Sequence, residues 1–212
     1  MPNHVRNLVS FEAQTEERAR EVMAFLFSPS GTVDFNNVIA RPEILDKTSC
    51  PNRVNPEECV AQTGYSDWYS WSLGTWGTKW NAYDNIVPWP VRRYVRLYNS
   101  RGMNRSSAYK YRVDKKWFKH HVKKNGYPKE VGFDTAWYIP DGVYLELSML
   151  FPDVIVKVRY ADEDVGCNCG IIHYMDGNEI FSDVAPDYNI QSENDKVCWR
   201  HFANEIHEVR FK

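Results

Sequence analysis

Apolar and polar positions along the chain follow two periods, and each period predicts one type of secondary structure. Residues 154–160 alternate, with apolar side chains at every second position, which is typical of a strand with one buried face. After Thr15, a residue type that caps helices, apolar residues recur at a spacing of three or four. The predicted strands are 5–13, 32–39, 131–137, 154–160 and 170–174, the last continuing through Asp176-Gly177 into a hairpin. The predicted helices are 16–26, 68–73, 79–83, 114–125, 142–150 and a terminal helix that begins near Ser192.

The order of these elements predicts an α+β fold with one mixed or antiparallel sheet and helices on one face. The chain has 212 residues, of which 43% are apolar, and this is enough for one domain core. We predict a single domain over residues 1–212 with two additions, a basic insertion at 88–129 and a C-terminal helical extension at 190–212. A charged fraction of 25% with a net charge of −2 is not typical of a disordered protein.

The near-neutral net charge conceals a separation of charge along the chain. Residues 88–129, which we call the basic window, contain thirteen basic residues and a single acid, Asp114. The rest of the chain has 13 basic and 27 acidic residues, so it forms an acidic body. Such an asymmetry indicates a polyanionic partner. The basic residues of the window are Arg92, Arg93, Arg96, Arg101, Arg105, Lys110, Arg112, Lys115, Lys116, Lys119, Lys123, Lys124 and Lys129.

The basic window is also rich in aromatic residues, with two tryptophans, one phenylalanine and five tyrosines. Single-stranded nucleic acids are bound by such mixtures, because rings stack on bases while cations neutralise phosphates. We therefore expect the window to bind nucleic acid. The alternative is that its rings are buried against the body while its cations form a solvated surface or pair with acids.

Residues 114–125 are expected to form a short basic helix within the window. Asp114 is suited to cap its first turn, and Gly126 is suited to end it. The expected outward positions include Lys115, Lys116, Lys119 and Lys123. Helical spacing predicts that the buried face consists of Trp117, Phe118, His121 and Val122.

Three phrases of the sequence are similar to those of a known family. They are Met1-Pro2-Asn3 with Asn7, the run Thr75-Trp76-Gly77-Thr78-Lys79-Trp80-Asn81-Ala82-Tyr83-Asp84, and Phe133-Asp134-Thr135-Ala136-Trp137 followed by Leu150-Phe151-Pro152. In this order they resemble the YubB-like family of small phage and plasmid proteins, which carries a ferredoxin-like domain. The chain departs from the family pattern at His4, Asn81 and Tyr138-Ile139. The resemblance implies a ferredoxin-like fold and a mobile-element setting, and it implies no reaction and no catalytic residue.

The tryptophan-rich phrases suggest a ligand pocket. Tryptophan rings would stack on a planar ligand, while Lys79 and Asp134 would bind its polar edges. The alternative is structural, with the tryptophans packing a helix onto the sheet and Lys79 paired with an acid. The candidate pocket residues are Trp76, Lys79, Trp80, Asp134 and Trp137.

A second set of residues has the chemistry of a tetrahedral zinc site. Its spacings are C-x-C followed by a histidine, and C-x2-H on the terminal helix. The alternative is that each cysteine acts as a small buried hydrophobic residue. The candidate zinc ligands are Cys167, Cys169, His173, Cys198 and His201.

The remaining sequence features bear on compartment and reaction class. Five cysteines are an odd number, too few for a disulfide scaffold, and they favour a reducing compartment. With the mobile-element setting that the resemblance implies, we expect this compartment to be the cytoplasm of a bacterial host. No stretch approaches the roughly 18 apolar residues of a membrane span. The chain has no G-x-S-x-G, phosphate-binding loop, H-E-x-x-H or dinucleotide-binding fingerprint.

We therefore expect a non-enzymatic phage or plasmid accessory protein that binds nucleic acid or a host nucleoprotein complex through residues 88–129. The alternative is a protein-binding inhibitor of a host defence system, of the anti-CRISPR or anti-restriction type, whose acidic body or aromatic surface meets a basic partner. The third possibility is a ligand pocket or an enzyme at the Trp-Gly-Thr-Lys-Trp phrase. Salt dependence separates the first two, because phosphate contacts weaken steeply as salt rises.

Overall fold

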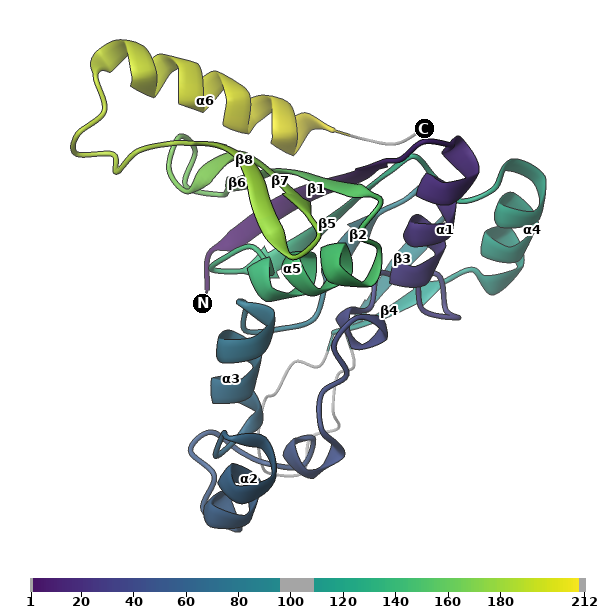
Figure 1. The fold of residues 1–212 in the computed structure, drawn as a ribbon, viewed down its shortest axis with the longest axis vertical. Coiled ribbons are helices and arrows are strands. Elements are labelled where there is room, and N and C mark those ends of the chain that lie inside the picture. Colours follow the sequence, from purple (N-terminus) through teal and green to yellow (C-terminus); the bar gives the residue numbers. More distant parts are fainter. Residues whose placement is uncertain (1, 96–108, 210–212) are drawn as a thin grey trace.

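The computed structural model describes residues 2–95 and 109–209, and for residues 91–95 and 109–113 it describes the backbone alone. The main body is a six-stranded sheet in which every neighbouring pair of strands is antiparallel (Figure 1). In spatial order the strands are β2 (Tyr83–Ile86), β5 (Glu130–Ala136), β1 (His4–Glu12), β6 (Ile155–Asp162), β7 (Cys169–Met175) and β8 (Asn178–Val184).

The centre of the sheet has the connection expected of a ferredoxin-like domain. β5 and β6 lie on either side of β1, both antiparallel to it, and α5 (Asp141–Leu150) connects them. Two parallel strands joined by a helix, with a third strand between them, form the split β-α-β unit of that fold. The predicted α+β fold is therefore confirmed, and its sheet is antiparallel throughout.

The two faces of the sheet are covered by different helices, because successive side chains of a strand point to opposite faces. Val5 and Val9 of β1 belong to the larger core, which also includes residues of α1 (Glu16–Leu26) and α5. Leu8 points to the other face and packs in a smaller core with Ile206 of α6 (Glu193–Glu208). The expectation of helices on one face thus holds for α1 and α5, while the C-terminal helix covers the opposite face (Figure 1).

Two helices begin at the predicted capping residues. The Thr15 side chain accepts a hydrogen bond from the Arg18 backbone N–H at 3.2 Å, which starts α1. Ser192 and Asp195 form a reciprocal capping box at the start of α6. These caps satisfy backbone N–H groups that lack partners in the first turn of any helix.

Two local predictions are wrong. Residues 32–39 do not form a strand, because Asp34 caps the short 3-10 turn η1 (Phe35–Asn37), and Asn81 Oδ1 accepts the Phe35 N–H at 2.9 Å. Side-chain oxygens therefore accept hydrogen bonds from backbone N–H groups that, in a strand, would bond to a neighbouring strand. Residues 79–83 are not a helix, because the chain bends there and Tyr83 already pairs with β5.

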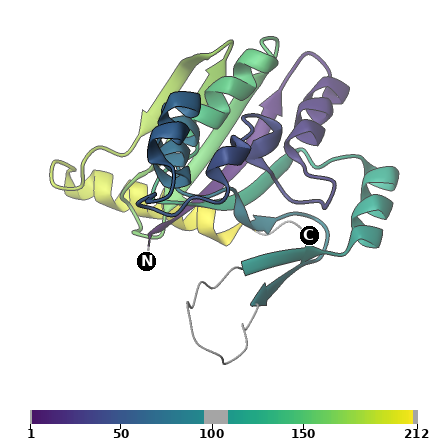
Figure 2. The same cartoon turned by 90° about the horizontal axis from the view of Figure 1, so that it is seen from below.

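The remaining elements form two additions to the sheet. One projects from the sheet in Figure 1 and comprises η2 (Glu43–Leu45), α2 (Pro56–Thr63), α3 (Trp68–Trp71) and the π-helical turn η3 (Ser72–Trp76). The other is the described part of the basic window, formed by β3 (Val91–Val95), β4 (Tyr109–Val113) and α4 (Lys115–Asn125), with α4 beside α1 (Figure 2). Among the described residues, no helix is both long and apolar enough to cross a membrane.

Candidate nucleic-acid interface

Helix α4 forms where the sequence predicts it. Asp114 Oδ1 accepts hydrogen bonds from the backbone N–H groups of Lys116 at 3.0 Å and Trp117 at 3.2 Å. Gly126 ends the helix with a φ of 73°, and its N–H donates to the Val122 carbonyl at 2.9 Å. The Lys123 and Lys124 side chains lie in the last turn, where the helix dipole favours positive charge.

An aromatic cluster attaches α4 to the body. Phe118 is only 7% exposed, and its ring centroid lies 4.9 Å from that of Trp89. Trp89 also contacts Phe27 at the end of α1, and its indole N–H donates to the Gly31 carbonyl at 2.8 Å. Arg20 of α1 adds a hydrogen bond to the Asn125 carbonyl at 3.0 Å. The helix is therefore held on one side by rings and at its end by an arginine.

The predicted buried face of α4 needs one correction. Phe118 is buried and Val122 is half-buried, as expected, but Trp117 is 55% exposed. Each residue advances about 100° around a helix, so Trp117 lies about 100° from Phe118, whereas Val122 lies only about 40° from it. Because Phe118 is at the centre of the buried side, the tryptophan points into solvent.

The lysines of α4 are free cations. All five are exposed, and within the described part of the chain none of them has an ion-pair partner. They are Lys115, Lys116, Lys119, Lys123 and Lys124. Lys129, by contrast, lies 3.1 Å from the Glu16 carboxylate, and hydrogen bonds from Arg20 and Lys129 hold the pKa of Glu16 below its usual value. The alternative that the window's cations pair with the acidic body thus applies to Lys129 and not to α4.

Four further basic residues of the window lie on the antiparallel hairpin that precedes α4. Its register places Arg92 opposite Arg112, Arg93 opposite Tyr111, and Lys110 opposite Tyr94. The backbone thereby places two arginines at one cross-strand pair. The predicted interface residues Arg96, Arg101 and Arg105 lie outside the described residues.

The predicted tryptophan pocket is divided between three places. Trp76 is 1% exposed, and its indole N–H donates to the Ile39 carbonyl at 3.0 Å, so it belongs to the core. Lys79 Nζ lies over three rings, 4.7 Å from the centroid of Trp137, 4.9 Å from Trp80 and 5.6 Å from Tyr69. It has no ion-pair partner among the described residues, so the expected pairing with an acid is not found.

Asp134, the fifth predicted pocket residue, lines a different cavity of about 350 Å³. It forms an ion pair with Arg6, whose Nη2 lies 3.3 Å from Asp134 Oδ2. Burial raises the pKa of Asp134, and the Arg6 guanidinium partly opposes that rise. The other residues lining the cavity are His4, Asp84, Glu163 and His207. No spacing in the sequence predicts this cavity, because its residues come from five separate segments.

Two residues of the family-like phrases have a structural role. Asn7 is fully buried, and its Nδ2 donates to Thr135 Oγ1 on β5 at 2.9 Å. The Tyr144 hydroxyl of α5 donates to Asn7 Oδ1 at 2.9 Å. This network joins β1, β5 and α5 across the core, and buried polar groups require such partners.

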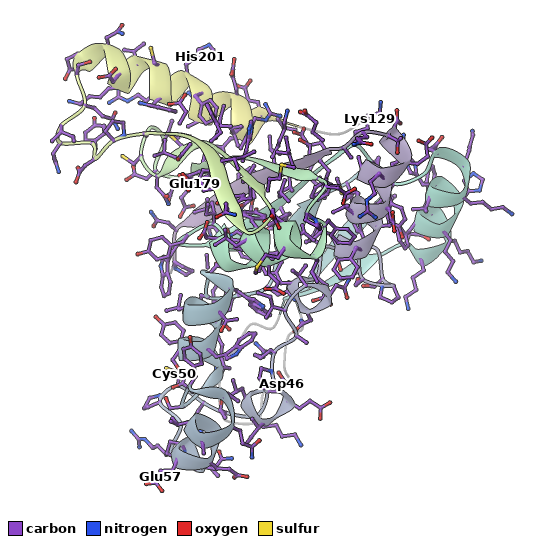
Figure 3. The ribbon with its side chains drawn as sticks, viewed as in Figure 1. Asp46, Cys50, Glu57, Lys129, Glu179 and His201 are labelled. Carbon is purple, nitrogen blue, oxygen red and sulfur yellow. The ribbon has the colours of Figure 1, made fainter. Side chains whose placement is uncertain are left out.

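The structure does not assemble the predicted zinc site. No group of three or more His, Cys, Asp or Glu side chains in residues 2–95 and 109–209 could hold a metal ion. The His173 ring packs on Phe181 at 5.0 Å, and Cys169 is buried, which raises the pKa of its thiol to about 12. His201 lies on the outer side of α6, 3.4 Å from Glu205 (Figure 3), and Cys198 is exposed. Cys167 is half-exposed in the turn before β7.

Comparison with known proteins agrees with the fold. Residues 115–202 match a family model described as a ferredoxin-like domain in Api92-like protein. The matched region begins at the first residue of α4 and ends within α6, so it contains β5 to β8 and excludes the β3–β4 hairpin. The comparison with curated proteins found no match, and neither did the comparison with solved structures.

Proposed function

We propose that this protein binds nucleic acid, free or within a host nucleoprotein complex, through α4 and the β3–β4 hairpin. The observation that carries the proposal is an exposed tryptophan among unpaired lysines. Trp117 is 55% exposed on a helix whose five lysines have no ion-pair partner within the described residues. An exposed ring next to free cations is the arrangement that single-stranded nucleic acid uses, with the ring stacked on a base and the cations beside phosphates.

The lysines and the tryptophan of α4 would contact different parts of a nucleic acid. Lysine ammonium groups neutralise phosphates and release counterions, which makes affinity fall as salt rises. A tryptophan ring stacks on any unpaired base, with a contribution of about 1–3 kcal/mol per base. The combination favours single strands or single-stranded loops over fully paired duplexes, because paired bases do not expose their faces.

The family resemblance supports a proposal for the biological setting. The phrases around Trp76 and Phe133 resemble YubB-like proteins of phages and plasmids, so we place this protein in the bacterial cytoplasm as a non-enzymatic accessory protein. A protein of this kind acts by occupying a nucleic acid or a nucleoprotein complex. The ferredoxin-like match over residues 115–202 supports the fold of this domain and carries no function by itself.

The test is a salt titration of binding to a short labelled single strand and to the matching duplex. Wild-type protein should bind the single strand, with log affinity falling linearly as log salt rises between about 0.05 and 0.2 M. Replacing Lys115, Lys116, Lys119 and Lys123 by Glu should nearly abolish binding and lower the salt slope by about four units. The fold should persist, because these side chains are exposed.

A matched control separates local contact from net charge. The pair Lys116→Glu and Lys123→Glu changes the net charge by the same amount as Lys47→Glu and Arg53→Glu, which lie at exposed positions between η2 and α2. Only the pair on α4 should weaken binding strongly. Absence of any affinity for single-stranded or duplex nucleic acid at low salt would contradict the proposal, and the inhibitor class would replace it.

A further inference from the structure

The chain contains a second charged segment, opposite in sign to the basic window. Residues 161–195 include nine acids and not one lysine or arginine. They comprise the end of β6 and the turn after it, β7, β8, the loop before α6 and the first residues of α6. The acids are Asp162, Glu163, Asp164, Asp176, Glu179, Asp183, Asp187, Glu193 and Asp195.

Strand β8 is an open edge at the centre of this acidic segment. It is the last strand of the sheet, and within the described residues its outer side pairs with no other strand. The Ala185 N–H donates to the Cys169 carbonyl at 2.9 Å, so these two residues form a hydrogen-bonded pair of the antiparallel ladder. Hydrogen-bonded and non-hydrogen-bonded residue pairs alternate along an antiparallel ladder. Val184 and Ser182 therefore belong to non-hydrogen-bonded pairs with β7, and their backbone N–H and C=O groups point away from it.

The open edge also exposes apolar side chains. All seven residues of β8 are exposed, with Ile180 at 50%, Phe181 at 47% and Val184 at 41%. Met149 and Leu150, at the end of α5, are 51% and 46% exposed, and the Met149 side chain lies against the β7–β8 turn at Gly177. Proteins normally protect such an edge with charged side chains, proline, a bulge or a covering segment. β8 has no lysine or proline, and its register shift lies before Phe181, so residues 181–184 stay regularly paired to β7.

Charge decides which kind of strand fits this edge. Glu179 and Asp183 are exposed and have no ion-pair partner within the part of the chain that the structure describes. The register shift between His173 and Tyr174 pairs Glu179 with Tyr174 and Asp183 with Ile171, so the two acids lie on opposite faces of the sheet. A second copy of this strand would bring the same acids to the edge, and like charges held close together repel. A segment rich in lysine or arginine would instead bring cations close to both acids.

We propose that β8 is a docking edge for an extended basic segment of a partner protein, which adds a seventh strand to the sheet. Backbone hydrogen bonds from Ser182 and Val184 provide the pairing, and apolar side chains of the partner cover Ile180 and Phe181. The site is separate from α4 and does not depend on nucleic-acid binding.

The test uses a capped peptide with alternating lysine and valine as the probe, and the same peptide with glutamate in place of lysine as its control. Wild-type protein should bind the lysine peptide and not the glutamate peptide, with amide chemical-shift changes concentrated on β8. Ser182→Pro removes one outward N–H without breaking the ladder to β7, so it should weaken binding at least tenfold. The matched variant Ser182→Ala keeps that N–H and should bind like wild type.

A charge-reversed variant tests the same edge if Ser182→Pro does not fold. The pair Glu179→Lys and Asp183→Lys should abolish binding of the lysine peptide and permit binding of the glutamate peptide. Equal affinity of Ser182→Pro and Ser182→Ala, or shift changes spread over the acidic loops and not over β8, would overturn strand addition in favour of diffuse charge attraction. The α4 quadruple variant should still bind the peptide, so failure of the proposed nucleic-acid function leaves this result unaffected.

Discussion

The basic helix α4 and the acidic edge strand β8 belong to the two oppositely charged segments of the chain, and they expose different parts of the polypeptide. On α4 the backbone groups are satisfied inside the helix, so only side chains are available for recognition. On β8 the outward groups of Ser182 and Val184 have no partner within the described residues, so the backbone itself is available. A net charge of −2 for the whole chain conceals two surfaces of opposite sign and different chemistry.

This difference has a measurable consequence. Binding through lysine side chains to a polyanion depends steeply on salt. Binding through backbone pairing and apolar contact depends on it weakly, with charge setting mainly the choice of partner. Salt dependence therefore distinguishes the two surfaces in the same protein.

The largest effect is expected from breaking the attachment of α4 to the body. Phe118→Ala removes a buried ring from the cluster with Trp89 and Phe27, and the free energy of unfolding should fall by about 3–5 kcal/mol. Chemical denaturation followed by circular dichroism measures this loss. A change below about 1 kcal/mol would mean that the aromatic cluster does not hold the helix, and α4 would then not be a rigid surface.

Trp117→Ala should leave stability nearly unchanged, because its ring is more than half exposed. Affinity for single strands should fall by about 1–3 kcal/mol if the ring stacks on a base, and the salt slope should stay that of wild type. Trp117→Phe is the matched control and should retain most of the affinity. Stability loss similar to that of Phe118→Ala would show that the ring is buried in solution.

The smallest effect tests whether the two surfaces are independent. Glu179→Lys with Asp183→Lys should change single-strand affinity by less than about threefold at 0.15 M salt, where the Debye length is about 8 Å. β8 is three strands away from β1, a separation of about 14 Å at about 4.8 Å per strand. Helix α1 and, beside it, α4 lie farther from β8 than β1 does (Figure 1). A tenfold rise in affinity would indicate that nucleic acid also reaches β8, and the two surfaces would then form one interface.

Features of the candidate sites were predictable where they depend on residues of a single helix or strand. The lysine pattern of α4, its Asp114 cap and its Gly126 end are local, and each is present as predicted. The exposure of Trp117 was not predictable, because the helix pattern allows several orientations and only packing against Trp89 and Phe27 selects one. The orientation of α6 about its own axis, likewise set by packing, keeps the predicted zinc ligands apart. Burial of Ala203 and Ile206 against the sheet leaves Cys198 and His201 exposed.

The sequence by itself determined the elements with strong periodicity, the helix caps, the α+β class and the two opposite charge segments. Alternation in β6 and the capping box of Ser192 and Asp195 depend on neighbouring residues alone, so they are legible without the fold. Only the tertiary structure decided that Asp134 pairs with Arg6 and that β8 is an edge. Strand order arises from contacts between distant segments, and whether a strand's outer hydrogen-bonding groups are free depends on that order.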